Sequence, residues 1–211
     1  MDVAILLFDG VTALDAVGPY EVFRCVPGVH VRFAASKAGP KITDAGVSAL
    51  IAEHKLKEIE RTDILVVPGT SQPQALLGDE EAIAWIRRVD AHTKWTTSVC
   101  TGALGLGAAG LLTGKRATTH WVALEMLRSF GAEPVSERFV RDGKVVTAAG
   151  VSAGIDMALA LTALEFGDTA AMTVQLAIEY NPQPPFNAGS PATAPAAIVE
   201  QLRQAYAGIG G

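Results

Sequence analysis

A single cysteine stands where a short β-prone run meets a series of small residues, in the segment from Trp95 to Gly107. The pattern predicts a strand that turns sharply into a helix, with the Cys100 thiol at the bend and at the carboxyl edge of a sheet. At such a position the free amides of the first helical turn and the positive end of the helix dipole favour a thiolate. A free cysteine is more commonly a small buried apolar residue. The strand–turn–helix context nevertheless favours a cysteine nucleophile here.

Asp15 is the carboxylate best placed to act with this thiol. It lies at the start of the helix predicted after the first strand, so its side chain can lean into the same crevice. A helix N-cap or a partner for the helix dipole would use an aspartate equally well at this position. Glu21, one to two turns further along the same predicted helix, is the second candidate.

Other polar and small residues are candidates for the substrate site. The Thr101 hydroxyl can hydrogen-bond a substrate atom and its amide can donate to an oxyanion, or the residue can simply cap the helix. His120 ends a short predicted strand and is a candidate general base, with a buried histidine bonded to the backbone as the alternative. Gly69, Thr70 and Gly150 lie in turns whose amides can face a ligand, although such glycines can also serve the turn alone.

Apolar runs alternate with amphipathic stretches along the whole chain, which predicts strands alternating with helices. Strands are predicted at residues 3–8, 30–35, 64–67, 95–99 and 117–120, and hairpins at 41–51 and 139–148. Helices are predicted from Thr12 or Asp15 towards Cys25, after Cys100, and at residues 79–91, 122–130, 152–165, 169–179 and 195–205.

This alternation predicts an α/β fold in which a mostly parallel sheet is covered by helices on both faces. Ligands of such sheets bind beyond the carboxyl ends of the strands, where Asp9-Gly10, Pro68-Gly69-Thr70, Cys100 and Ala149-Gly150 fall. We expect a single domain over residues 1–211, with a Pro-rich C-terminal arm at about 181–211 that wraps the surface.

The composition excludes several classes of function. With 49% hydrophobic and 18% charged residues, the 211-residue chain is typical of a globular domain rather than a disordered one. The net charge of −5 and the lack of a long basic run argue against a nucleic-acid partner. The two cysteines, Cys25 and Cys100, form no disulfide framework, and no signal peptide or membrane span is recognisable, so we expect a cytoplasmic protein. The scattered histidines argue against a metal site, and the glycine pattern argues against a dinucleotide site.

Four motifs together resemble the ThiJ/PfpI superfamily, over at least residues 1–180. They are Leu14-Asp15-x-x-Gly18-Pro19-x-Glu21-Val22-Phe23, Pro68-Gly69, Ser98-Val99-Cys100-Thr101-Gly102, and the segment from Gly110 to Trp121 that ends in Ala117-Thr118-Thr119-His120-Trp121. The resemblance implies a flavodoxin-like three-layer sandwich with a nucleophile-elbow cysteine. The peptidase-like and chaperone-like branches place a histidine directly after that cysteine, whereas this chain has Thr101. The Cys-Thr-Gly and Ala-Thr-Thr-His-Trp pattern is similar instead to isonitrile hydratases and to the sensory domains of AraC-type regulators.

The hydratase branch implies a lyase that converts an isonitrile and water into an N-substituted formamide without a cofactor. By this resemblance the Cys100 thiolate attacks the terminal isonitrile carbon to form a thioimidate. Asp15 is then the proton donor to that carbon and the base that helps water attack, and Thr101 orients the intermediate or its water. Gly69, Thr70, His120 and Gly150 are the expected substrate-binding residues. Trp121 and Phe186 are further candidates for the lining of the pocket.

Other functions stay open at this point. Cys100 could be an oxidisable thiol in a non-catalytic redox or metabolite sensor, or the nucleophile of a glyoxalase- or deglycase-like enzyme acting on small dicarbonyls; peptidase activity comes third. The AraC-type regulators append a helix-turn-helix module, and the residues after Asn181 are too few for one, which favours an enzyme. The resemblance also implies a homodimer with the pocket near the interface, and a small-molecule substrate as the other partner, with no membrane partner.

Overall fold

A seven-stranded sheet forms the centre of the protein in a computed structural model that describes residues 1–46 and 48–207. The strand order is β10-β11-β7-β6-β1-β2-β5, and every neighbouring pair is parallel except the antiparallel hairpin β10–β11. The strands are β1 (Asp2–Leu6), β2 (His30–Ala35), β5 (His54–Lys55), β6 (Ile64–Val67), β7 (Trp95–Val99), β10 (Phe139–Asp142) and β11 (Val145–Ala148). The predicted α/β fold with a mostly parallel sheet is confirmed.

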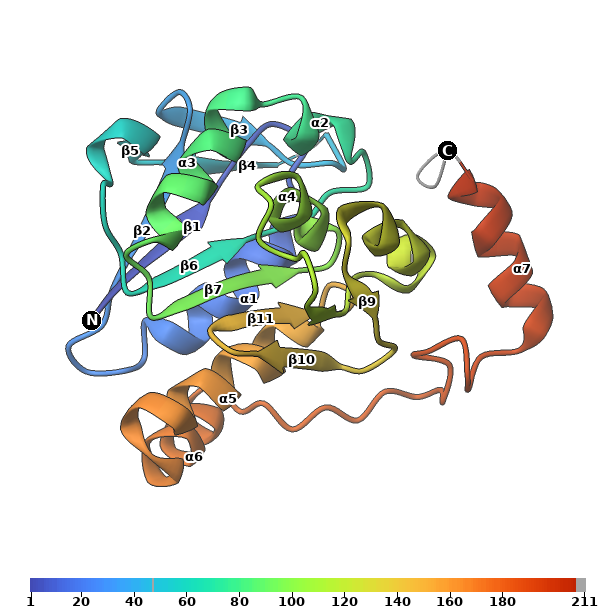
Figure 1. Ribbon diagram of the computed structural model, residues 1–211. Coiled ribbons are helices and arrows are strands. Elements are labelled where there is room, and N and C mark those ends of the chain that lie inside the picture. The colour runs from blue at the N-terminus through green and yellow to red at the C-terminus, as the bar shows by residue number, and fades with distance from the viewer. Residues whose placement is uncertain (47, 208–211) are drawn as a thin grey trace.

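Helices cover both faces of this sheet, as the alternating pattern predicts (Figure 1). On one face lie α1 (Ala13–Phe23), α5 (Ala153–Phe166) and α6 (Asp168–Ala177); on the other lie α2 (Gln74–Leu77), α3 (Glu80–Asp90) and α4 (Gly102–Ala108). The central strands β1 and β6 are almost wholly apolar and buried because both of their faces meet helices. The hairpin predicted at 41–51 is the antiparallel pair β3 (Gly39–Ile42) and β4 (Ala49–Ala52), whose turn includes Val47, outside the described residues.

The start of α3 has a side-chain cap. Asp79, the first residue of the helix predicted at 79–91, accepts a hydrogen bond from the Ala82 amide at 2.9 Å and caps α3. Residues 181–195 contain no helix or strand. The final helix, α7 (Ala196–Ala205), begins directly after Pro195. None of the helices in the described part of the chain has the length and apolar character needed to cross a bilayer.

Two predicted elements differ from the structure. The stretch predicted as an α-helix at 122–130 is the 3-10 helix η2 (Trp121–Phe130), which ends at Gly131 in the left-handed region with φ 75°. The strand predicted at 117–120 is shorter: β8 (Arg116–Ala117) pairs with β9 (Glu133–Pro134) in a sheet of its own. Residues 118–120 leave that pairing because Thr118 and Thr119 bond side chains and backbone elsewhere, the first to Thr147 and the second to Cys100.

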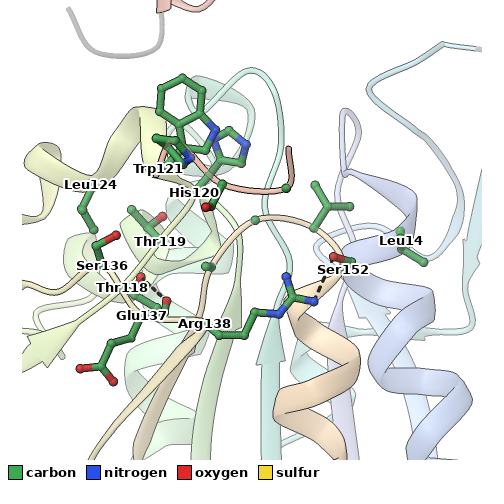
Figure 2. A pocket seen from close by; sticks show the side chains of 16 residues that line it. Leu14, Thr118, Thr119, His120, Trp121, Leu124, Ser136, Glu137, Arg138 and Ser152 are labelled. Atoms are coloured by element: carbon green, nitrogen blue, oxygen red, sulfur yellow. Dashed lines mark hydrogen bonds between the residues drawn. The ribbon is translucent and has the colours of Figure 1, made fainter. Parts of the chain in front are cut away.

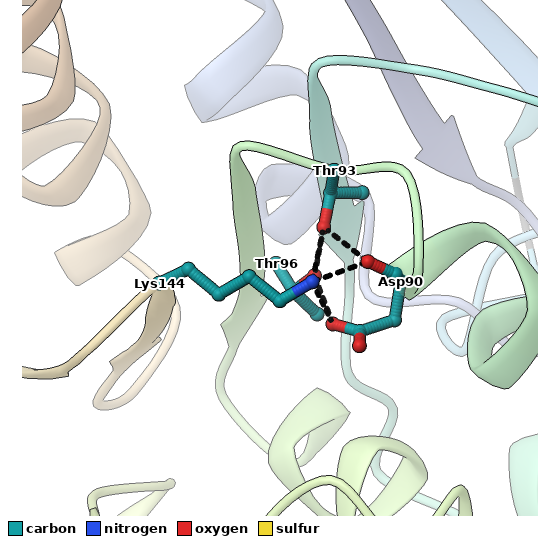
Figure 3. Close-up of polar contacts among 4 residues, drawn as sticks. All are labelled: Asp90, Thr93, Thr96 and Lys144. Carbon is teal, nitrogen blue, oxygen red and sulfur yellow. Dashed lines mark hydrogen bonds and ion pairs between the residues drawn. The ribbon is translucent and has the colours of Figure 1, made fainter.

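A polar cluster fixes the hairpin β10–β11 at the amino end of β7 (Figure 3). Lys144 Nζ donates to the Asp90 carbonyl at the end of α3, and lies 3.3 Å from Thr93 Oγ1 and 3.2 Å from Asp90 Oδ1. The Thr96 hydroxyl donates to Asp90 Oδ1 at 2.6 Å. The Lys144 ammonium group therefore gives a hydrogen-bond donor to a carbonyl at the end of α3 and links that helix to the hairpin. This cluster lies at the opposite end of β7 from Cys100.

Candidate active site

Cys100 occupies a strained turn between β7 and α4. Its φ of 56° lies in the left-handed region, which a residue with a side chain rarely adopts. The conformation is held from both sides, because the Cys100 amide donates to the carbonyls of Ala148 (3.1 Å) and Ala149 (2.9 Å). The Thr119 hydroxyl donates to the Cys100 carbonyl at 2.7 Å. The strand–turn–helix predicted from the sequence thus places the thiol at the carboxyl edge of the sheet.

Close backbone approach explains two glycines around the turn. A Cβ on Gly102 would lie 2.0 Å from the Val67 carbonyl oxygen, and one on Gly69 would lie 2.5 Å from the Thr101 amide nitrogen. The start of α4 can therefore pack against the end of β6 only because both positions lack a side chain.

Asp15 comes from the first turn of α1 and is completely buried. Its Oδ2 accepts a hydrogen bond from the Gly69 amide at 2.9 Å, and its carboxyl group contacts the Cys100 thiol. The other carboxyl oxygen, Oδ1, is buried and accepts no hydrogen bond from any of the described residues. A buried carboxylate oxygen without a donor is costly. The same oxygen is the one left available for a proton.

Burial controls the protonation of this pair. It raises the pKa of Asp15 from 3.8 to about 7, and the contacts with the Gly69 amide and the Cys100 thiol offset only part of the effect. Burial, followed by the charge of Asp15, raises the pKa of the Cys100 thiol to about 12. The amides of Val151 and Thr101 oppose that rise, as the position at a helix start leads one to expect, but they are outweighed. Asp15 is therefore the group that titrates near neutral pH, while the sulfur keeps its proton.

The Thr101 hydroxyl is engaged with the neighbouring loop. It accepts a hydrogen bond from the Thr70 amide at 2.8 Å and donates to the Thr70 carbonyl at 2.7 Å. Its side chain also approaches the Cys100 sulfur closely enough to lower the pKa of the thiol. The hydroxyl has one proton, so it serves either the Thr70 carbonyl or the sulfur at any moment.

Two adjoining cavities open beside the thiol. A smaller cavity of about 190 Å³, here called the chamber, is lined by Cys100, Thr101, Thr12, Asp44, Thr70, Ser71, His120, Val122, Val151 and Tyr206. A larger one of about 450 Å³, here called the vestibule, is bordered by Gly150, Trp121, Arg138 and Ser152 among others (Figure 2). Within the vestibule, the Arg138 guanidinium donates to the Ser152 hydroxyl at 3.1 Å. His120 and Val151 border both cavities, so they mark the boundary between them.

His120 is a neutral side chain at this boundary. Burial lowers its pKa, and its Nδ1 accepts a long hydrogen bond of 3.5 Å from the Val122 amide at the start of η2. This bond assigns the ring proton to Nε2, which is then a donor. Gly150 packs against the ring, because a Cβ there would lie 2.8 Å from His120 Cδ2. The backbone bond fits the second alternative that the sequence left open, and the ring also lines the chamber; a role as general base stays a prediction.

The structure brings some predicted residues together and leaves others aside. Cys100, Thr101, Thr70 and His120 line the chamber, and Gly150 borders the vestibule. Asp15 lines neither cavity; it is buried against the Cys100 thiol. The Gly69 amide faces Asp15 rather than a cavity. Glu21, the second carboxylate candidate, is exposed and paired with Arg24 at 2.6 Å, away from the thiol. Phe186 was wrongly expected in the pocket lining: it is 78% exposed and borders neither cavity.

Six of the ten residues that line the chamber were not predicted as site residues: Thr12, Asp44, Ser71, Val122, Val151 and Tyr206. Asp44 follows β3, accepts the Thr12 hydroxyl at 2.6 Å, and its charge adds to the raised pKa of Asp15. The Asp-Ala-Gly run around it indicates only a turn. Val151 has a φ of 21°, and no pattern in the sequence marks it. Tyr206 reaches the chamber from the far end of the chain.

No group of three or more His, Cys, Asp or Glu side chains in residues 1–46 and 48–207 is arranged to hold a metal ion. A mostly parallel sheet with a strained cysteine at its carboxyl edge and a buried acid against it places the chain among α/β proteins with a cysteine at a strand-to-helix turn.

The chain belongs to the DJ-1/PfpI family, whose model matches residues 1–164. It is 43% identical over 204 residues to an isonitrile hydratase of Pseudomonas putida, an alignment that covers 97% of this chain and 89% of the hydratase. A crystal structure of a ThiJ/PfpI family protein from Pseudomonas syringae superposes with a TM-score of 0.94 at 38% identity, covering 98% of this chain and 86% of that one. The HTH-type transcriptional regulator CdhR of Pseudomonas aeruginosa is 29% identical over 82% of this chain but only 53% of the regulator.

Proposed function

We propose that this protein hydrates an isonitrile to an N-substituted formamide, with Cys100 as the covalent nucleophile and Asp15 as the general acid and base. The observation that carries the proposal is the buried Asp15 carboxyl against the Cys100 thiol at a chamber of about 190 Å³. Identity of 43% to an isonitrile hydratase over nearly the whole chain supports the same reaction class. The chamber lies below the range of drug-sized pockets, which suits a small substrate.

The first half of the reaction moves one proton from sulfur to carbon. Ionised Asp15 accepts the Cys100 proton while the sulfur attacks the terminal carbon of R–N≡C, forming the carbon–sulfur bond. The protonated Asp15 then donates that proton to the same carbon, which leaves a thioimidate, Cys100–S–CH=N–R. Asp15 returns to its ionised form, and a pKa near 7 suits a group that must both accept and donate.

The second half uses one water molecule. Its oxygen bonds to the thioimidate carbon as Asp15 accepts a proton from it, and that proton passes to the nitrogen. The remaining hydroxyl proton returns to the sulfur as the carbon–sulfur bond breaks and the carbonyl forms. The product is R–NH–CHO, and both Cys100 and Asp15 are restored, so the sum is one isonitrile plus one water.

Neighbouring groups fit supporting roles in this sequence. The Val151 and Thr101 amides that lower the pKa of the thiol stabilise negative charge on sulfur during attack and departure. The Thr101 hydroxyl can turn its proton from the Thr70 carbonyl toward the sulfur. Nε2 of His120 is a donor at the boundary of the chamber, where it can meet the substrate nitrogen.

The experiment that tests the proposal is hydration of an aryl isonitrile by freshly reduced protein, followed by ultraviolet absorbance, with the formamide identified by mass spectrometry. We expect turnover by the wild type and none by Cys100→Ala, while Cys25→Ala, which removes the half-buried second thiol, stays active. Asp15→Asn should lower the rate by about 10²–10⁴-fold. Undiminished turnover by either site variant would overturn the mechanism.

The competing functions give different results in the same preparation. A redox sensor would show a peroxide-dependent mass increase at Cys100 and no hydration. A dicarbonyl enzyme would consume small dicarbonyls in preference to isonitriles. We also propose that the protein is a homodimer, as the family resemblance implies, and that it is cytoplasmic. Sedimentation velocity of the purified protein tests the homodimer.

A further inference from the structure

The C-terminal arm, residues 181–207, lies outside the part of the chain that the family model matches. It runs as an extended, Pro-rich stretch to α7, which stands at the outside of the molecule beyond η2 (Figure 1). The arm nevertheless supplies a wall to both cavities at the site. Gly189, Ser190 and Pro191 border the vestibule, and Tyr206 borders the chamber.

Few contacts hold the arm in this position. The Tyr206 ring lies 6.2 Å from the His120 ring, and the Arg203 guanidinium lies 6.0 Å over the Trp121 ring. Between η2 and the arm a gap of about 60 Å³ remains, lined by Trp121, Ile198 and Leu202 among others. Ile198 is still 47% exposed and Leu202 40% exposed. The arm therefore docks on the rim of the site without becoming part of the core.

We propose that Tyr206 is a specificity-determining residue. It closes the outer wall of the chamber and so limits the size of the substituent on any electrophile that reaches Cys100. The other walls of the chamber come from loops that follow strands and from the start of η2, where Val122 packs against the core. Tyr206 follows the last turn of a helix with little burial, so it is the wall that one substitution removes at least cost to the fold. For isonitriles the inference rests on the proposed hydration, but the barrier acts on any reagent that must reach the thiol.

The first test compares two isonitriles, one with a compact substituent and one with a bulky substituent. We expect Tyr206→Ala to raise the ratio of kcat/KM for the bulky over the compact substrate by about ten-fold or more, the usual size of a steric pocket effect. Tyr206→Phe keeps the ring and should leave the ratio unchanged. Phe186→Ala removes an aromatic ring from the same arm away from the cavities, and it should also leave the ratio unchanged.

The second test does not depend on hydration. In a Cys25→Ser background, Cys100 is alkylated by iodoacetamide and by a bulkier N-arylmaleimide, and the two rate constants are compared at one pH so that thiol ionisation cancels. Tyr206→Ala should raise the maleimide to iodoacetamide ratio by about ten-fold or more, and Phe186→Ala should not. A raised ratio without any isonitrile turnover would support the role of Tyr206 and overturn the proposed function.

Equal ratios in the wild type and in Tyr206→Ala, in both tests, would overturn the assignment. So would an equal rise in Tyr206→Phe, because that variant retains the ring that is argued to form the wall. Unfolding temperatures measured for each variant show that every comparison is made between folded proteins.

Discussion

Replacing Asp15 by asparagine should stabilise the protein at neutral and higher pH, although it removes a residue placed in the active site. Burial raises the pKa of Asp15 from 3.8 to about 7, so between these values the folded protein holds a proton that the unfolded chain releases. Wild-type stability therefore declines as the pH rises from 3.8 to about 7, and the full cost of ionising the carboxyl is present above 7. Asparagine carries no such charge, and its side-chain carbonyl can still accept the Gly69 amide.

The pKa difference sets the size of the effect. The interval from 3.8 to about 7 spans roughly three pH units, and each corresponds to about 1.4 kcal/mol, which gives an upper bound of about 4 kcal/mol. Local relaxation around a buried charge reduces such penalties in real proteins. Above pH 7, we expect the free energy of unfolding of Asp15→Asn to exceed that of the wild type by about 2 kcal/mol or more. The difference should shrink towards zero as the pH falls to about 4.

Urea denaturation of both proteins at a series of pH values measures this difference directly. Glu125→Gln provides the control, because Glu125 is a highly exposed carboxylate on η2 that pairs with Arg128 at the surface. The free energy of unfolding of the control should change with pH in the same way as that of the wild type, across the whole pH range. Wild-type and Asp15→Asn curves that also run parallel would refute the reasoning, because they would mean that Asp15 titrates alike in the folded and unfolded chain.

Three further outcomes follow from the geometry. Wild-type kcat/KM for the isonitrile should fall about ten-fold for each pH unit below about 7, because only ionised Asp15 can accept the Cys100 proton, and a flat profile in stopped-flow or steady-state rates would contradict this. Gly102→Ala should destabilise the fold by about 3 kcal/mol or more in urea titrations, because its Cβ would lie 2.0 Å from the Val67 carbonyl oxygen; an unchanged midpoint would contradict the close approach. Lys144→Met removes the ammonium group from the polar cluster at the opposite end of β7 from Cys100, so it should lower the free energy of unfolding by about 1–3 kcal/mol. The alkylation rate of Cys100 should stay unchanged, and an altered rate would contradict the independence of the cluster from the site.

The elements that carry the nucleophile could be predicted because local sequence determines them. The run that became β6 is short and apolar, the run that became β7 is short and β-prone, and both are followed by turns. The small residues after Cys100 allow a helix to start against the sheet. Parallel strands bring their carboxyl ends to one edge, so the approach of Asp15 to Cys100 follows from topology. The pattern cannot say how deeply the pair is buried. That depth is what reverses the expected preference for a thiolate.

The remaining walls depend on contacts between distant parts of the chain. Asp44 reaches the chamber only because β3 and β4 fold back over the first loop, where Asp44 bonds Thr12. Tyr206 reaches it from the end of the arm, and nothing in the spacing of the last helix marks that position. The η2 segment has the apolar spacing of an α-helix, yet it is 3-10 because His120 and Gly131 set its two ends against the site and the small sheet.

The protonation of the pair favours one order of events at the thiol. The pKa of the Cys100 thiol lies above that of Asp15, so moving the proton from sulfur to the carboxylate is uphill before a substrate arrives. In the mechanism proposed above, attack on carbon therefore accompanies proton transfer to Asp15 rather than following it. The strained turn at Cys100 serves this coupling, since it fixes the sulfur beside the buried carboxyl and beneath the Val151 and Thr101 amides. Under that mechanism, Cys100 stays in the unreactive thiol form until an electrophile small enough to enter the chamber is present.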